Sequence, residues 1–117
     1  MSIPFNFKKK YTEEKRKKES DRIIKQYPDR LPIICELDDK FNEKLDKSKY
    51  LVPKNLTIRQ FNFIIRKRMK LSESEATFLF TENSILIAGH ETINDLEIYK
   101  NNDGFLYIKV FKENTFG

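Results

Sequence analysis

The sequence has no tryptophan, one cysteine, one histidine and three glycines in 117 residues. One cysteine cannot form an internal disulfide, and one cysteine with one histidine does not make up a usual zinc site. No glycine-rich phosphate loop is present. No apolar run approaches the roughly 20 residues that cross a bilayer, and no signal-peptide pattern opens the chain. These absences argue against a protein with a phosphate-binding loop, a zinc protein and a small disulfide-bonded protein. They favour a reducing compartment, the cytosol or the nucleus.

Catalytic side chains are equally scarce. Cys35 alternates with Ile33 and Leu37 on a strand pattern, which is typical of a buried, inert thiol. A nucleophilic cysteine needs a base, and nothing in the sequence places His90 beside it. We therefore expect no catalytic residue, no metal and no cofactor.

The charge is unevenly distributed along the chain. The net charge is +5, and the first thirty residues hold ten Lys and Arg against five Asp and Glu, so the rest is neutral. A basic element added to a neutral domain could contact nucleic acid, an anionic membrane or an acidic protein. A solvated helix face is the alternative interpretation. Both concern the same seven side chains: Lys8, Lys9, Lys10, Lys15, Arg16, Lys17 and Lys18.

Two helices and an edge strand are predicted in the first seventy residues. Thr12 is a suitable N-cap for a helix near 12–26. The strongest helix pattern covers 57–70, where Thr57 and Gln60 form a capping box and the apolar residues share one face. Residues 33–37 alternate as a strand with one buried face. A second strand is predicted at 50–52, and we expect it to be an edge strand because Pro53 lacks the N–H of an interior ladder.

The last forty residues predict further strands and a short helix. Residues 78–80 indicate a strand, and 85–87 could return antiparallel to it after a turn. Thr92 and Asp95 mark a short helix. A turn at 101–104 precedes a final strand, 105–111, which is apolar on both faces and therefore belongs in the middle of a sheet.

The order of these elements predicts an α+β fold, a β-grasp in which the 57–69 helix covers the sheet. We expect one domain spanning 1–117, in which 1–27 form an N-terminal helical extension, 28–112 the core and 113–117 a flexible conjugation tail.

Several spaced segments resemble the autophagy-related protein 8 family, which includes GABARAP. They are Tyr27-Pro-Asp-Arg-Leu-Pro-Ile-Ile-Cys-Glu, Lys49-Tyr-Leu-Val-Pro, Asn55-Leu-Thr, Gln60-Phe, Ile65-Arg-Lys-Arg, Gly104-Phe-Leu-Tyr and Glu113-Asn-Thr-Phe-Gly. The resemblance covers nearly the whole chain and implies a ubiquitin-like β-grasp with additional N-terminal helices. The chain departs from the family at Leu86-Ile87, where members often have two prolines, and 84–103 match poorly.

The resemblance implies a function in autophagosome formation. Gly117 would be the lipid-attachment residue, joined covalently to phosphatidylethanolamine through ubiquitin-like activating and conjugating enzymes, and a cysteine protease would remove the lipid. A glycine suits this acyl transfer because it has no side chain to hinder a narrow channel. Relatives often carry residues after the glycine, so a chain ending at Gly117 is either encoded that way or trimmed. The protein would be cytoplasmic, with its lipidated form on autophagosome or related vesicle membranes.

The resemblance also implies that autophagy receptors with short linear motifs bind beside the 50–52 strand, by adding an extended strand to its edge. One pocket, for an aromatic side chain, would use Glu19, Ile23, Pro32, Ile34, Lys49, Leu51 and Phe105. A second, for an aliphatic side chain, would use Tyr50, Val52, Pro53, Leu56, Phe61, Ile64 and Arg68. Acids flanking the peptide would be attracted by Arg30, Lys47 and Lys49. Spacing alone is equally consistent with core packing for Phe61, Ile64 and Phe105, but Tyr50 and Leu51 are harder to explain as core.

Two other function classes compete with a lipid-conjugated adaptor. A protein-conjugated modifier, similar to the twelfth autophagy protein, shares the β-grasp and terminal glycine but does not explain the helical N-terminus. A basic nucleic-acid-binding module has charge alone in its favour, and we expect no nucleic acid among the partners.

Overall fold

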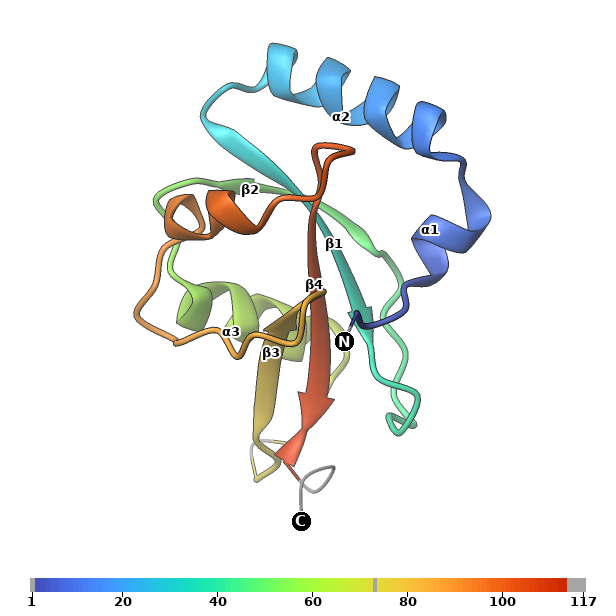
Figure 1. The fold of residues 1–117 in the computed structure, drawn as a ribbon. Helices are drawn as coiled ribbons and strands as arrows, with labels where there is room; N and C mark the ends of the chain where they lie inside the picture. The colour runs from blue at the N-terminus through green and yellow to red at the C-terminus, as the bar shows by residue number, and fades with distance from the viewer. Residues whose placement is uncertain (1, 73, 114–117) are drawn as a thin grey trace.

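The computed structural model describes residues 2–72 and 74–113. The elements in chain order are α1 (Asn6–Lys10), α2 (Glu13–Gln26), β1 (Arg30–Leu37), β2 (Lys49–Pro53), α3 (Ile58–Arg68), β3 (Thr77–Thr81), the 3₁₀ helix η1 (Asn94–Tyr99) and β4 (Leu106–Lys112). The four strands form a sheet in the order β2-β1-β4-β3. β1 and β4 are parallel, and the other neighbours are antiparallel (Figure 1).

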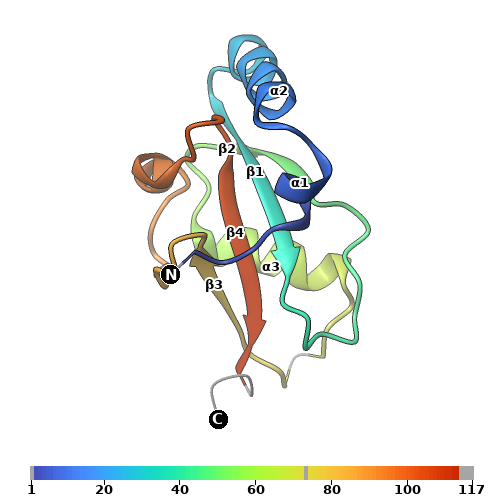
Figure 2. The same ribbon diagram turned by 45° about the vertical axis from the view of Figure 1, so that its right-hand side comes forward.

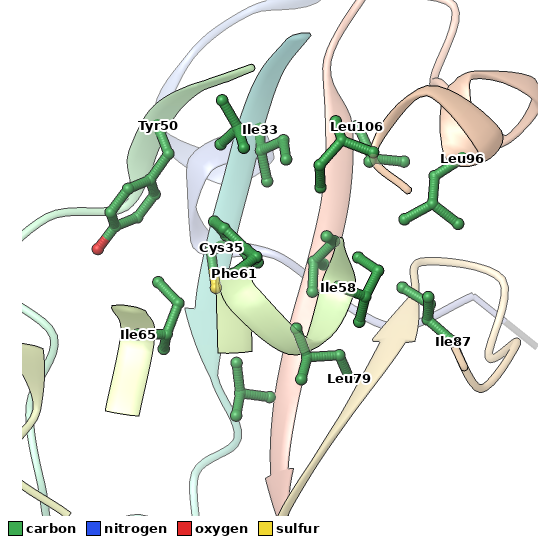
Figure 3. Packing of buried hydrophobic residues seen from close by; sticks show 14 of the residues in the cluster. Ile33, Cys35, Tyr50, Ile58, Phe61, Ile65, Leu79, Ile87, Leu96 and Leu106 are labelled. Carbon is green, nitrogen blue, oxygen red and sulfur yellow. The ribbon is translucent and has the colours of Figure 1, made fainter. Parts of the chain in front are cut away.

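Helix α3 covers one face of this sheet, as its apolar stripe predicts. Thr57 and Gln60 form the expected capping box, with bonds of 2.9 Å and 3.2 Å between the side chain of one and the backbone N–H of the other. Ile58, Phe61 and Ile65 are buried against β1 and β4 (Figure 3). The helix ends at Arg68, two residues before the end predicted from the sequence at residue 70. Lys70 has a φ of +53°, a left-handed conformation in which an α-helix cannot continue.

The opposite face of the sheet is covered by α1 and α2 (Figure 2). The buried side chains between them and the sheet are Phe5, Phe7, Ile23, Ile34, Phe105 and Tyr107. The expectation of a single buried face on β1 is therefore wrong, because Ile34 is as fully buried as Ile33. Helix α1 has only five residues, too few to produce a periodic pattern in the sequence.

The final strand is central, as its two apolar faces predict. β4 lies between β1 and β3, with Leu106, Ile108 and Val110 in the α3-side core. Gly104 precedes it with a φ of +92° in the expected turn, a conformation that favours glycine.

The segment between β3 and β4 is less regular than predicted. The return of 85–87 is present as one antiparallel bridge between Phe80 and Leu86, not as a strand. The short helix is confirmed as η1, and Thr92 and Asp95 exchange side-chain-to-backbone bonds of 2.9 Å and 3.2 Å at its start.

Candidate functional site

The free edge of β2 offers backbone groups to a ligand. β2 is the outer strand of the sheet on one side, which confirms the edge position predicted from Pro53. The N–H of Cys35 donates to the carbonyl of Ser48 at 2.8 Å, and this bond sets the alternation of the β1–β2 ladder. With Tyr50 opposite Ile33, Tyr50 exchanges its backbone bonds with β1. The N–H and C=O groups of Lys49 and Leu51 therefore point away from β1.

Proline is tolerated at two places in this ladder for the same geometric reason. Pro32 is opposite Leu51, and Pro53 is opposite Arg30. Both are positions at which the residue of one strand does not donate to the other, so the missing N–H costs no bond between β1 and β2. The ladder can hence be complete while β2 keeps an outward-facing edge.

Side chains of β2 alternate between the two faces of the sheet. Tyr50 and Val52 belong to the core beneath α3, whereas Leu51 packs against the cluster beneath α2. The two predicted pockets are therefore on opposite faces of one strand.

The residues of the predicted aromatic pocket lie together in the structure, and most of their side chains are buried. Ile23, Pro32, Ile34 and Phe105 are buried, and Leu51 lies at their margin. Lys49 and Glu19 form an ion pair that joins β2 to α2.

The residues of the predicted aliphatic pocket are divided between core and surface. Val52 and Phe61 are buried, Leu56 packs against the same core, and Pro53, Ile64 and Arg68 are exposed. This side of β2 therefore presents an apolar floor with an accessible rim.

Tyr50 is part of the core, which corrects the expectation that packing alone would not explain it. Only 7% of the residue is exposed, and its ring meets the Phe61 ring edge-on at 5.9 Å between centroids. Its hydroxyl donates to the carbonyl of Lys47 at 2.8 Å. Burial raises the pKa of Tyr50 to about 12.

The predicted cations lie at opposite ends of β2. Lys47 and Lys49 are at its start, and Arg30 is paired with Pro53 at its end. A groove between α1 and the 38–48 loop continues from the start of β2. Lys10 and Lys44 also line it. The sequence assigned Lys10 to the N-terminal basic cluster and not to the peptide site, and Lys44 was missed because no pattern relates it to β2.

The basic cluster of the N-terminus is divided by the fold. Lys8 forms an ion pair with Glu82 and lies over the Tyr107 ring, and Arg16 bonds Asp103. Lys9, Lys10 and three lysines of α2 remain exposed; the three are Lys15, Lys17 and Lys18. Lys8 and Arg16 thus hold the N-terminal helices on the sheet.

Cys35 and His90, the remaining candidates for a catalytic role, are a buried and an exposed residue in the structure. Cys35 is fully buried, and this burial raises the pKa of its thiol well above the usual range, which is the opposite of what a nucleophile needs. His90 is exposed in the loop before η1. No helix among the described residues is both long and apolar enough to span a bilayer. Gly117 and most of the expected 113–117 tail lie outside the described residues.

Comparison with known proteins gives consistent matches along the chain. Residues 15–117 match the family model described as "Autophagy protein Atg8 ubiquitin like". The Schizosaccharomyces pombe autophagy-related protein 8 is 48% identical over 112 residues, covering 95% of this chain and 93% of the relative. The Arabidopsis thaliana autophagy-related protein 8e is 49% identical over 105 residues, covering 89% of this chain and 86% of the relative.

Solved structures of similar proteins have the same fold. The Trypanosoma brucei ATG8 crystal structure superposes with a TM-score of 0.87 at 36% identity, covering 95% of this chain and 97% of that one. Plasmodium falciparum Atg8, solved in complex with a P. falciparum Atg3 peptide, superposes with a TM-score of 0.80 at 28% identity, covering 92% of this chain and 95% of that one. These likenesses confirm the ubiquitin-like fold predicted from the sequence, and the chain belongs to the Atg8 family of ubiquitin-like autophagy proteins.

Proposed function

We propose that this autophagy protein acts as a lipid-conjugated adaptor. In this proposal Gly117 is joined to phosphatidylethanolamine, and the edge of β2 binds short peptides with the pattern aromatic-x-x-aliphatic. The observation that supports the docking half is that the residues predicted for the two pockets lie on opposite faces of one edge strand.

The spacing of the motif follows from that placement. In an extended peptide, residues three apart point to opposite faces and stand about 10 Å apart along the strand. A peptide paired with Lys49 and Leu51 would send one anchor beneath α2 and the other beneath α3. The spacing of three therefore requires no unusual twist of the peptide, because the two faces of the sheet supply the two pockets.

The direction of the peptide follows from the order of the pockets. The aromatic pocket includes Lys49 and Leu51, and the aliphatic pocket lies further along β2, at Val52 and Pro53. The peptide would thus run parallel to β2. Residues before its aromatic anchor would lie over the groove that begins at Lys47, where acidic side chains would be attracted by Lys47 and Lys49, although Glu36, Asp38, Asp39 and Glu43 also line the groove. Acids after the aliphatic anchor would approach Arg30.

The lipid half of the proposal rests on family membership and on physical chemistry. A diacyl lipid supplies two chains, each buried CH₂ contributing about 0.8 kcal/mol, and two chains anchor stably where one is marginal. This chain would be a substrate and not an enzyme, since activating and conjugating enzymes supply the nucleophiles. The P. falciparum Atg3 peptide complex supports a conjugating enzyme as a partner, and a cysteine protease would reverse the attachment.

The proposed localisation and domain division follow from the same function. The unconjugated protein would be cytoplasmic and the lipidated form would lie on autophagosome or related vesicle membranes. Residues 28–112 would be the folded core, with 1–27 as its helical extension and 113–117 as the conjugation tail.

The docking edge is tested with surface variants that spare the core. Tyr50→Ala is unsuitable because Tyr50 is buried, and truncating a buried aromatic residue costs about 3–5 kcal/mol of stability. Leu51→Ala and Ile64→Ala are better, since Leu51 is half-buried and Ile64 is 42% exposed. Loss of an anchor contact commonly costs about 2 kcal/mol, near thirtyfold in affinity.

Calorimetry would compare these variants for an aromatic-x-x-aliphatic peptide, with Phe63→Ala as the matched control. Phe63 is also exposed on α3 but is not among the predicted pocket residues. Weakened binding by Leu51→Ala and Ile64→Ala, with Phe63→Ala near wild type, is expected. Wild-type affinity in both pocket variants would refute docking at β2.

The lipid attachment is tested by deleting Gly117 and measuring intact mass after incubation with activating and conjugating enzymes and phosphatidylethanolamine vesicles. The full chain should gain the mass of one lipid, and the deletion variant should gain none. A protein adduct in place of the lipid would favour the protein-conjugated modifier. Enzyme-dependent lipidation of the deletion variant would refute the role of Gly117.

A further inference from the structure

Lys112, the last residue of β4, is a nearly buried cation. Its side chain is 11% exposed, and its Nζ lies 3.1 Å from Oε1 of Glu43 and 3.5 Å from Oε2 of Glu75. The same Nζ is 5.1 Å from the centroid of the Phe41 ring. Oε1 of Glu43 is buried and has no hydrogen bond from the described residues, so the ammonium of Lys112 is the charge that compensates it. The contact with Glu43 is also the main cause that raises the pKa of Lys112.

The two carboxylates hold Lys112 from opposite sides. Glu43 belongs to the 38–48 loop, which follows β1, and Glu75 belongs to the segment that enters β3. Since β4 lies between β1 and β3, these two segments flank its end, and Figure 1 shows β3 beginning beside the end of β4. One ammonium therefore ties together three segments that are distant in the sequence.

Lys112 fastens β4 beyond the point at which its pairing with β1 ends. The last register pair with β1 joins Leu37 to Val110. On the other side, the N–H of Glu113 still donates to the carbonyl of Ala76 at 3.0 Å. Among the described residues, the end of β4 thus has a strand neighbour only in β3, and the ion pair of Lys112 with the loop after β1 replaces the missing contact on the other side.

This fastening sets the starting point of the segment that carries the proposed lipid-attachment residue. Gly117 follows Lys112 by five residues, which span at most about 17 Å when extended. An activating enzyme must receive Gly117 within that reach. The carboxylate of Gly117 would displace pyrophosphate from ATP, and the thiolate of the enzyme would then displace AMP from the resulting adenylate to form a thioester. If β4 frayed at Lys112, more of the backbone would have to be ordered for each reaction, which would slow it.

We propose that Lys112 is a positioning residue for conjugation at Gly117: held by Glu43 and Glu75, it fixes the place at which the 113–117 segment leaves the fold. This inference rests on the proposed lipid attachment. Lys112 would act through the backbone of β4 and would not touch the reacting atoms. Its loss should therefore slow the reaction of the bound protein more than it weakens binding to the enzyme.

The test compares Lys112→Met with the full wild-type chain in forming the thioester with the activating enzyme. Methionine keeps an unbranched apolar side chain beside Phe41 but has no ammonium. Thioester formation with ATP would be followed on gels over a range of protein concentrations. We expect kcat to fall about three- to tenfold, because additional backbone must be ordered in each turnover, while KM stays within about twofold. Lys112→Arg should restore much of the rate because it keeps the cation.

Two further variants separate positioning from a general loss of charge. Glu43→Gln combined with Glu75→Gln removes both anions and keeps Lys112, and it should slow thioester formation to a similar extent. Lys54→Met is the matched control, because Lys54 also has an ion pair, with Glu97 at 3.6 Å, but lies after β2 and not at the end of β4. It should react at the wild-type rate. Thermal unfolding of each variant would verify that it is folded.

Hydrogen exchange gives a second readout that needs no enzyme. The N–H of Glu113, which donates to Ala76, should exchange about three- to fivefold faster in Lys112→Met, the scale of a lost ion pair. The N–H of Ile93, which donates to the carbonyl of Leu56 at 2.8 Å, should exchange at the wild-type rate.

The possible results have distinct consequences. A wild-type rate of thioester formation in Lys112→Met would refute the inference, and so would a slower rate without faster exchange at Glu113, because β4 would then be intact. A raised KM with an unchanged kcat would also overturn it, by showing that Lys112 contacts the enzyme. If the folded wild type formed no thioester, or if the chain without Gly117 formed one, the proposed attachment itself would fail.

Discussion

Arg16 donates a hydrogen bond from Nε to Oδ2 of Asp103 at 2.8 Å, and so joins α2 to the turn that precedes β4. The side chain of Asp103 is completely buried and that of Arg16 is 11% exposed. The same Oδ2 accepts the hydroxyl of Tyr107 at 2.5 Å, and Oδ1 accepts the N–H of Phe105 at 2.9 Å. This carboxylate therefore couples the N-terminal extension to the central strand.

Removing the cation should be costly. Arg16→Met leaves a buried carboxylate without its charge partner, and breaking a buried pair in this way costs about 3–5 kcal/mol. We expect urea unfolding of Arg16→Met to show a loss of about 3 kcal/mol. The control is Arg22→Met, an exposed arginine on the same helix, which should change stability by about 0.5 kcal/mol or less. Similar losses for both variants would contradict this role of the pair.

The turn before β4 should not tolerate a side chain. A Cβ on Gly104 would lie 2.9 Å from Cβ of Ser20, and its φ is +92°. Gly104→Ala should therefore lose about 2 kcal/mol or more, from strain and from the displaced α2. Gly89→Ala is the matched control, because the nearest atoms to its Cβ all belong to the Arg59 side chain, at ordinary contact distances of 3.4 Å or more. Thermal unfolding of the two variants checks the expectation, which a stable Gly104→Ala would overturn.

The N-terminal lysines should separate into a structural and an exposed class. Lys8→Gln loses the ion pair to Glu82 and the contact with the Tyr107 ring, so it should lower stability by about 1 kcal/mol. Lys9→Gln with Lys10→Gln removes two exposed charges and should instead slow association with anionic vesicles at low salt.

Stopped-flow association and urea unfolding on the same variants would distinguish the two classes. Since surface electrostatics weaken at high salt, the difference in association rate should disappear there. Unchanged rates for the Lys9 and Lys10 variant at low salt would support the solvated-face interpretation of these residues.

Alkaline pH should destabilise the fold through two tyrosines. Burial raises the pKa of Tyr50 to about 12, from 10.0, and burial with the Asp103 contact raises that of Tyr107 further. The folded state therefore holds protons that the unfolded state releases, so stability is full below about pH 10 and falls as pH rises toward 12.

Tyrosinate absorbance during unfolding experiments would follow this loss. Tyr50→Phe should flatten the decline in stability above pH 10, while Tyr99→Phe, at a less buried tyrosine, should leave it unchanged. A decline of the same slope in Tyr50→Phe would show that Tyr50 does not contribute.

The sequence alone determined the elements that depend on local chemistry and on periodicity. The capping box of Thr57 and Gln60 positions α3, Pro53 marks β2 as an edge, and the two-sided apolar pattern of 105–111 makes β4 central. Each of these signals is contained within a few consecutive residues, because caps, ladder bonds and strand alternation act over that distance. The family resemblance added Gly117 and the pocket residues.

Only the tertiary structure decided which residues contact one another. The full burial of Tyr50, the occupation of Arg68 by Asp46 and the structural role of Lys8 all arise from contacts between segments that are distant in sequence. No local pattern encodes such pairs, since an exposed-looking lysine or aspartate in sequence becomes a partner only when packing of the sheet and helices brings its counter-charge within reach.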